Sequence, residues 1–154
     1  MVETHEIRAL VAPIPGNSGV LVPGSVVAEV IGFSEPDPYG DAPEWLLGEL
    51  EWNGWQVPIV HFAKLAGTSS ENTVPPRSRI LVVKTLSDAA SVLHLGLVIS
   101  GMPRIRKVTT GNLAEAGDSN AEGIFSHVML EDEPAVIPDL DTLAVTIEKA
   151  VYRA

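Results

Sequence analysis

The chain of 154 residues contains no cysteine. This absence excludes disulfide bonds, thiolate nucleophiles and zinc sites built on thiolates. Basic residues are also scarce, because 10 Lys and Arg stand against 20 Asp and Glu, which gives a formal net charge of −10. Nucleic-acid binding relies on Lys and Arg that neutralise phosphates, so we expect no nucleic-acid partner. No apolar run approaches the roughly 20 residues that a membrane-spanning helix needs, so we expect no membrane insertion.

The sequence also lacks the common signatures of catalysis and targeting. There is no GxSxG, GxxxxGK[ST] or GxGxxG motif. The first six residues lack the basic start and apolar centre of a signal peptide, so we expect a cytoplasmic protein. Metal-ligand spacing is absent from the four histidines, which we interpret as strand or surface residues: His5, His61, His94 and His127. Glu49, Glu51 and the acidic run 131–133 are interpreted as solvated acids, and we expect no enzyme activity, metal or cofactor.

What the chain does contain is a strong hairpin signal. Asn53-Gly54 lies between two apolar-rich runs, which predicts a two-residue turn because both turn positions take positive φ. Side chains alternate between the two faces of such a ribbon. The predicted pairs on the apolar face are Trp52–Trp55, Leu50–Val57 and Gly48–Ile59, and those on the other face are Glu51–Gln56, Glu49–Pro58 and Leu47–Val60. The two tryptophans either fill a core or stand at a partly exposed rim as interface anchors, and both interpretations stay open here.

Frequent turn residues, 13 Gly and 12 Pro, divide the rest of the chain into short segments. About ten short strands predict one or two small β-barrels. The strands outside the hairpin are expected at residues 7–13, 20–23, 25–33, 79–85, 91–100, 104–108, 124–130 and 134–137. The runs ILVV (80–83) and LGLVIS (95–100) are apolar on both faces, which indicates strands that lie between two packed barrels.

Two helices are expected in the second half of the chain. Residues 110–117 are predicted to form a short helix that ends at Gly117. The C-terminal helix begins after a cap at Asp139 or Asp141. Its predicted apolar stripe consists of Leu140, Leu143, Ala144, Ile147 and Val151.

Six segments, taken together, resemble the CheW-like domain family, whose members are adaptors of bacterial chemosensory arrays. They occur in the family's order and at about its spacing: 22–23 (VP), 27–31 (VAEVI), 42–48 (APEWLLG), 53–60 (NGWQVPIV), 95–99 (LGLVI) and 137–143 (IPDLDTL). The run WLLGELEW (45–52) and the acidic, proline-rich segment 34–44 are most similar to ChpC-type adaptors, which serve type IV pili and twitching motility.

The resemblance implies an all-β fold of two intertwined five-stranded SH3-like barrels, with short helices and a C-terminal helix. It implies a single CheW-like domain over residues 1–154, whose second barrel spans roughly 26 to 100. It also implies a non-catalytic adaptor without a cofactor. Such an adaptor couples the cytoplasmic tip of a methyl-accepting chemoreceptor to the regulatory domain of a CheA-type histidine kinase.

Candidate contact residues follow from the same motif positions. Val27, Glu29 and Gly48 fall where the family's receptor contacts lie, and a bulky residue at position 48 is expected to obstruct docking. The hairpin's apolar face is expected to pack the first barrel, while its end borders the groove between the barrels. Four apolar residues are candidates for the groove wall or the kinase-binding face, although plain core residues are the favoured alternative: Val82, Val83, Val98 and Ile99.

Two positions depart from the family pattern. The family usually has Arg just before the turn glycine, where this chain has Asn53, and it has an acid where this chain has Ser100. If that Arg normally pairs with the glutamate matching Glu29, the pair is missing here. We therefore expect altered partner contacts around Asn53.

Two other classes of function are weighed against the adaptor. A small-ligand-binding β-barrel sensor would need a pocket of several hundred cubic ångströms with convergent polar groups. A hydrolase-like enzyme would need perturbed carboxylates or histidines in a cleft. The sequence supplies no positive feature for either class.

Overall fold

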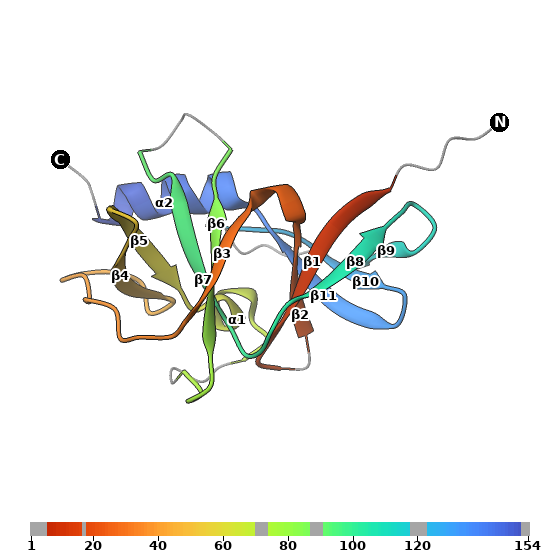
Figure 1. Cartoon of the computed structure of the whole chain (residues 1–154), viewed down its shortest axis with the longest axis horizontal. Coiled ribbons are helices and arrows are strands. Elements are labelled where there is room, and N and C mark those ends of the chain that lie inside the picture. Colours follow the sequence, from red (N-terminus) through yellow and green to blue (C-terminus); the bar gives the residue numbers. More distant parts are fainter. Residues whose placement is uncertain (1–5, 17, 70–73, 87–90, 118–122, 152–154) are drawn as a thin grey trace.

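A computed structural model of the chain describes residues 6–16, 18–69, 74–86, 91–117 and 123–151, which form two β-sheets (Figure 1). In spatial order, the six-stranded sheet contains β8 (Arg104–Val108), β1 (Ile7–Ile14), β2 (Ser18–Pro23), β11 (Glu133–Pro138), β10 (Ile124–Leu130) and β9 (Leu113–Gly117). The five-stranded sheet contains β3 (Val27–Gly32), β6 (Arg79–Lys84), β7 (His94–Ile99), β5 (Trp55–Val60) and β4 (Leu46–Trp52). The all-β prediction is confirmed, with six strands rather than five in the first sheet.

The helical segments are short, apart from the last one. They are the 3-10 turn η1 (Gly24–Val26), α1 (Phe62–Ala66) and α2 (Leu140–Val151). Within the described parts of the chain, no helix is long and apolar enough to cross a membrane.

The centre of the molecule is an apolar layer that both sheets share. On β6, Leu81 and Val83 face this shared core, whereas Ile80 and Val82 face the five-stranded sheet's own core. All four side chains are fully buried. This arrangement confirms the interpretation of the ILVV run as a strand buried on both faces, since a strand with one solvated face alternates apolar and polar residues.

The six-stranded sheet divides its side chains in the same way. Val11 and Leu21 face that sheet's own core, whereas Ala12 and Val20 face the shared core. The chain therefore buries three apolar layers, and a fully buried Val or Leu contributes about 1.5–3 kcal/mol. Strands β1, β2, β6 and β7 fix the position of one sheet against the other.

Helix α2 lies over the shared core along the five-stranded sheet (Figure 1). Asp139 caps its start, because the Asp139 carboxylate accepts hydrogen bonds from the Thr142 amide at 3.1 Å and the Thr142 hydroxyl at 2.8 Å. Asp141, the alternative cap, instead accepts a hydrogen bond from the Leu86 amide at 2.8 Å. The predicted apolar stripe of α2 packs on the shared core: Leu140, Leu143, Ala144, Ile147 and Val151.

The predicted helix at residues 110–117 is wrong. Residues Leu113–Gly117 form strand β9, which pairs with β10. A turn precedes it, in which the Asn112 side chain accepts from the Thr109 amide and donates to the Lys107 carbonyl. Ala, Leu and Glu favour a helix by propensity, but pairing along the edge of β10 satisfies the backbone and decides the outcome.

The Asn53-Gly54 turn is confirmed, with φ of 48° at Asn53 and 83° at Gly54. The predicted register holds for five pairs, from Trp52–Trp55 to Gly48–Ile59. The sixth pair is wrong, because Val60 lies opposite Leu46 and a bulge falls at Leu47.

The hairpin's apolar face packs a different core from the one expected. Val57 and Ile59 lie in the core of the five-stranded sheet with Ile80, Val82 and Val98, not in the first barrel. The reason is topological, since β5 pairs with β7 and β7 pairs with β6.

Helix α1 has no counterpart in the sequence-based prediction. His61 caps it, because its Nδ1 accepts a hydrogen bond from the Lys64 amide at 3.4 Å. The His61 ring is buried beside Phe62. This histidine therefore has a structural position, as the sequence interpretation allowed.

Gly48 is required by the backbone at the bulge. Its φ is +143°, and an added Cβ would lie 2.2 Å from the Asp37 carbonyl oxygen. The Asp37 amide donates to the Glu49 carbonyl at 3.0 Å, and the Glu49 amide donates back at 2.9 Å, so the segment cannot easily move away. Gly48 is buried and contributes backbone geometry rather than an exposed contact.

We predict that Gly48→Ala lowers the free energy of unfolding by at least about 2 kcal/mol, since this backbone region is nearly restricted to glycine. Urea denaturation measures the loss. Gly32→Ala is the matched control, because nothing lies within 4 Å of an added Cβ there. Equal stability of the two variants would contradict the structural role of Gly48.

Candidate functional site

The residues singled out in the sequence separate into buried and exposed groups. Val82, Val83, Val98 and Ile99 are each at most 2% exposed, and they belong to the two cores that meet at the five-stranded sheet. Their side chains are thus not at the surface, as the core interpretation expects. Glu29 and Asn53 are exposed, and Val27 is half-buried on β3.

An aromatic cluster stands where the β4–β5 hairpin ends. It consists of Trp52, Trp55 and His94, the first residue of β7. The His94 ring centroid lies 5.1 Å from that of Trp52 and 5.2 Å from that of Trp55. Trp52 is half-buried against the core of the five-stranded sheet, whereas Trp55 is 46% exposed. Of the two interpretations left open, Trp52 fits partial core packing and Trp55 fits the exposed rim.

The cluster also connects the two edges of the five-stranded sheet. The Trp52 indole Nε1 donates a hydrogen bond to Glu29 Oε1 at 3.3 Å. Glu29 lies on β3 and Trp52 on β4, which are the outermost strands of that sheet. Glu29 therefore has a partner here, although the sequence has no Arg at position 53 to pair with it.

His94 is electrostatically unusual. Burial lowers the pKa of its imidazole below the ordinary value of 6.5, and the charge of Lys84 lowers it further. Lys84 lies directly opposite His94 in the β6–β7 register. Among the described residues, the buried His94 Nδ1 has no hydrogen-bond partner. The neutral form of the ring is thus favoured where it packs against both indoles.

A hollow of about 230 Å³ opens beside the aromatic cluster. Its lining is formed by Trp55, Gln56, Ser91, Val92, Leu93 and His94. Ser91 is held against α2, because its hydroxyl donates to Glu148 Oε2 at 2.9 Å. The hollow combines three polar side chains with three apolar ones, among which the exposed Trp55 suits the binding of a partner side chain.

Other polar groups form structural contacts instead of a reactive centre. The Tyr39 hydroxyl donates to Glu49 Oε2 at 3.1 Å. Within the described ranges, no three His, Asp or Glu side chains gather as a metal site would require.

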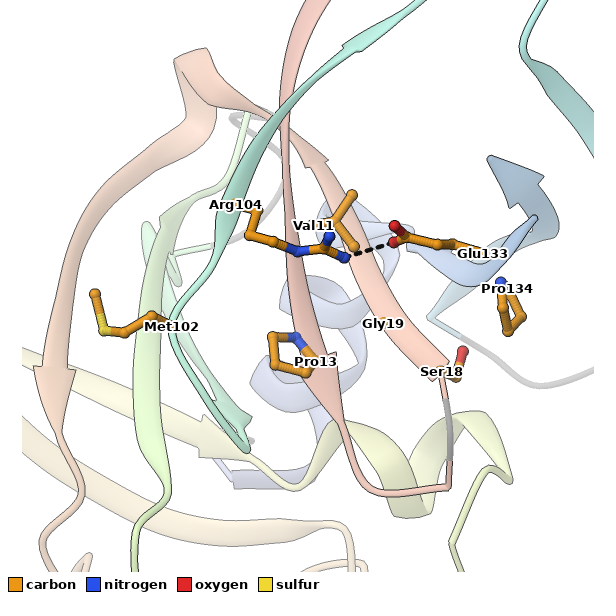
Figure 2. A pocket seen from close by; sticks show the side chains of 8 residues that line it. All are labelled: Val11, Pro13, Ser18, Gly19, Met102, Arg104, Glu133 and Pro134. Atoms are coloured by element: carbon orange, nitrogen blue, oxygen red, sulfur yellow. Dashed lines mark hydrogen bonds and ion pairs between the residues drawn. The ribbon is translucent and has the colours of Figure 1, made fainter. Parts of the chain in front are cut away.

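A second hollow, of about 250 Å³, lies on the six-stranded sheet (Figure 2). Arg104 crosses it to reach Glu133 at 2.6 Å, and Arg106 binds the other oxygen of Glu133 at 2.7 Å. The hydrogen bond from Arg104 is the main cause that lowers the pKa of Glu133. These ion pairs tie β8 to the start of β11, so we interpret them as structural links within the sheet and the hollow as no reactive site.

The sequence analysis missed the aromatic cluster as a unit. It singled out Trp52 and Trp55, which flank the turn, but not His94, which is 39 positions beyond Trp55 and joins them only through the pairing of β7 with β5. Glu29 was singled out, but its contact with Trp52 depends on the curvature that brings the two sheet edges together.

Comparison with known proteins adds a family and a fold. The family model for the CheW-like domain matches residues 9–148. The crystal structure of the scaffolding protein TtCheW from Thermoanaerobacter tengcongensis aligns with a TM-score of 0.70 and 15% sequence identity, covering 88% of this chain and 90% of that chain. No curated protein sequence matches significantly.

We predict that the His94 titration midpoint lies below that of an ordinary histidine, about 6.5. Trp55→Ala should raise it, because water reaches the ring, and Lys84→Met should raise it by less, because burial is the larger cause. NMR titration of the imidazole measures all three midpoints.

The lowered pKa of His94 also makes the stability of the fold depend on pH. Because the pKa is lower in the folded state, the contribution of His94 to the free energy of unfolding is complete above its unfolded-state pKa. This contribution is lost as the pH falls through the folded-state pKa. A midpoint at or above the ordinary value in the unmodified protein would contradict the partial burial of the ring as the cause of its lowered pKa.

Proposed function

Because the chain belongs to the CheW-like domain family, we propose that it is a non-catalytic adaptor of chemosensory signalling. In this proposal, it binds the cytoplasmic tip of a methyl-accepting chemoreceptor and the regulatory domain of a CheA-type histidine kinase. It acts by holding the kinase where the receptor's signal reaches it. Its place of action is the cytoplasm, and it needs no cofactor.

The observation that carries the proposal is the exposed aromatic cluster. Trp55 is 46% exposed at the end of the β4–β5 hairpin, and Trp is among the residues most enriched at interface hot spots. The cluster lies beside Glu29, an exposed position that matches a family contact motif, and beside Asn53, the exposed turn position at which the family usually has Arg. We assign this end of the five-stranded sheet to the receptor tip, whose helical hairpin presents side chains to the hollow beside Trp55.

The resemblance to one subfamily suggests which pathway the adaptor serves. The run 45–52 and the acidic segment 34–44 resemble ChpC-type adaptors, so the pathway proposed is the control of type IV pili and twitching motility. In support of a specialised partner, Glu29 accepts a hydrogen bond from Trp52, and Asn53 occupies a turn position with φ of 48°. An Arg at position 53 would have to adopt this positive φ, at a cost of about 1–2 kcal/mol.

A small-ligand sensor that uses the hollow beside Trp55 is less well supported. The hollow beside Trp55, of about 230 Å³, is smaller than the roughly 300–1,000 Å³ of typical ligand pockets. Of its polar lining groups, Gln56, Ser91 and His94, Ser91 is already bound to Glu148.

The test is calorimetric titration of the chain with two fragments from its own organism, a soluble receptor-tip fragment and the kinase regulatory domain. We expect micromolar, one-to-one binding to each. Trp55→Ala should weaken receptor-tip binding by about tenfold or more, in the range of a hot-spot truncation, and leave regulatory-domain binding unchanged. The thermal midpoint should shift by only a few degrees, because Trp55 is half exposed.

Leu86→Ala is the control, since Leu86 is a more exposed apolar residue, at 75%, and is not among the residues that line the hollow. It should leave both affinities unchanged. Failure of both fragments to bind would sink the adaptor proposal itself. Normal binding of the receptor tip by Trp55→Ala would keep the adaptor but remove the aromatic cluster from its contact surface.

A further inference from the structure

The six-stranded sheet has a smaller core of its own than the five-stranded sheet. Two alanines are among the six buried side chains of this core, which are Ala9, Val11, Leu21, Val128, Leu130 and Ala135. The corresponding core of the five-stranded sheet contains only Val and Ile, and the half-buried aromatic side chains of Phe33 and Trp52 pack against it. The six-stranded sheet therefore has less apolar volume with which to fill its inner face.

An ion pair lies on the same face as this small core. In the β1–β8 register, Arg106 lies opposite Ala9 and Val108 lies opposite Ile7. Directly opposite residues point to the same face. The Arg106 guanidinium binds the Glu133 carboxylate at 2.7 Å. The inner face thus combines a few buried apolar residues with a charged pair instead of forming one continuous apolar layer.

A hollow of about 140 Å³, which we call the apolar hollow, opens on this inner face. Its lining includes Ala9 and Leu21 of the buried core and the half-buried Val108, Leu113 and Ile137. Among the described residues, every one that lines it is apolar. An apolar cavity of about 150 Å³ engineered into another protein stays dry and binds benzene. The apolar hollow matches that cavity in size and in the chemistry of its lining.

We propose that the apolar hollow binds a small uncharged molecule through a hydrocarbon ring of about the size of benzene. The ring gains dispersion contacts with lining atoms that otherwise have no partner on one side. A polar ring is disfavoured, because its donors or acceptors would leave water without gaining a hydrogen bond. The hollow is too small for most ligands of drug size, whose pockets span roughly 300–1,000 Å³. This site goes beyond the adaptor proposal and lies on the other sheet from the aromatic cluster.

The test titrates benzene into the methyl-labelled full-length protein and follows the methyl signals by NMR. We expect saturable shifts at Leu21, Val108, Leu113 and Ile137, with a Kd of about 1 mM because a small ring makes few contacts. The comparison probe is pyrazine, a ring of the same size with two nitrogen acceptors. It should bind at least about tenfold more weakly, because those acceptors find no donor in the lining. Neither probe is a partner of the adaptor, so the result does not depend on that proposal.

Two variants locate the contact. Ala9→Leu enlarges a side chain of the lining and should weaken benzene binding by at least about tenfold, because it fills the apolar hollow. Leu113→Asp places a carboxylate at a half-buried lining position and should have a similar effect without overpacking the core. Leu93→Asp is the matched control, since Leu93 lines the hollow beside Trp55 instead, and it should leave benzene binding unchanged. Methyl signals of the five-stranded sheet verify that each variant is folded.

Three results would overturn the proposal. The first is equal affinity for benzene and pyrazine. The second is a set of shifted signals that centres on Ile80 or Leu93, or that persists unchanged in Ala9→Leu and Leu113→Asp. The third is the absence of any saturable shift up to the solubility limit of benzene. In that case the apolar hollow is no small-molecule site, and its lining is left to contact a protein side chain.

Discussion

The apolar layer between the two sheets is the constraint on which the other features depend. Strands β6 and β7 are buried on both faces, so each must satisfy two cores at once. A one-residue shift of β6 would exchange Leu81 and Val83 with Ile80 and Val82 between the cores. Pairing with β3 on one side and β7 on the other fixes that register. Strands β3 and β4 are the edges of the five-stranded sheet, and they carry the exposed Glu29 and the partly exposed Trp52.

The aromatic cluster follows from this arrangement. Pairing of β5 and β6 with β7 brings His94 to the hairpin end, where its ring contacts those of Trp52 and Trp55. The curvature of the five-stranded sheet brings Glu29 of β3 to the Trp52 indole. Because the hairpin is anchored by Val57 and Ile59 in the core, its exposed Trp55 is presented on a rigid support. A rigid aromatic anchor loses little conformational entropy on binding, which suits an adaptor whose function is attachment rather than chemistry.

The sequence predicted those structural features that depend on local chemistry or on a strong hydrophobic pattern. Asn53-Gly54 fixed the turn through positive φ, Asp139 provided a capping carboxylate, and the ILVV run indicated a doubly buried strand. Contacts between distant segments were harder to predict. Nothing local reveals that Asp37 approaches Gly48 and forces the bulge at Leu47, or that β10 offers an edge that turns residues 113–117 into a strand. The candidate contacts at Val82, Val83, Val98 and Ile99 lie inside for the same reason, because both faces of β6 and β7 are covered.

An adaptor must hold two partners at the same time, and sedimentation velocity of the chain with the receptor-tip fragment and the kinase regulatory domain measures this directly. The account predicts a ternary species that sediments faster than either binary complex, with each partner retained when the other is in excess. Mutual displacement of the two partners, with binary complexes at every ratio, would contradict it.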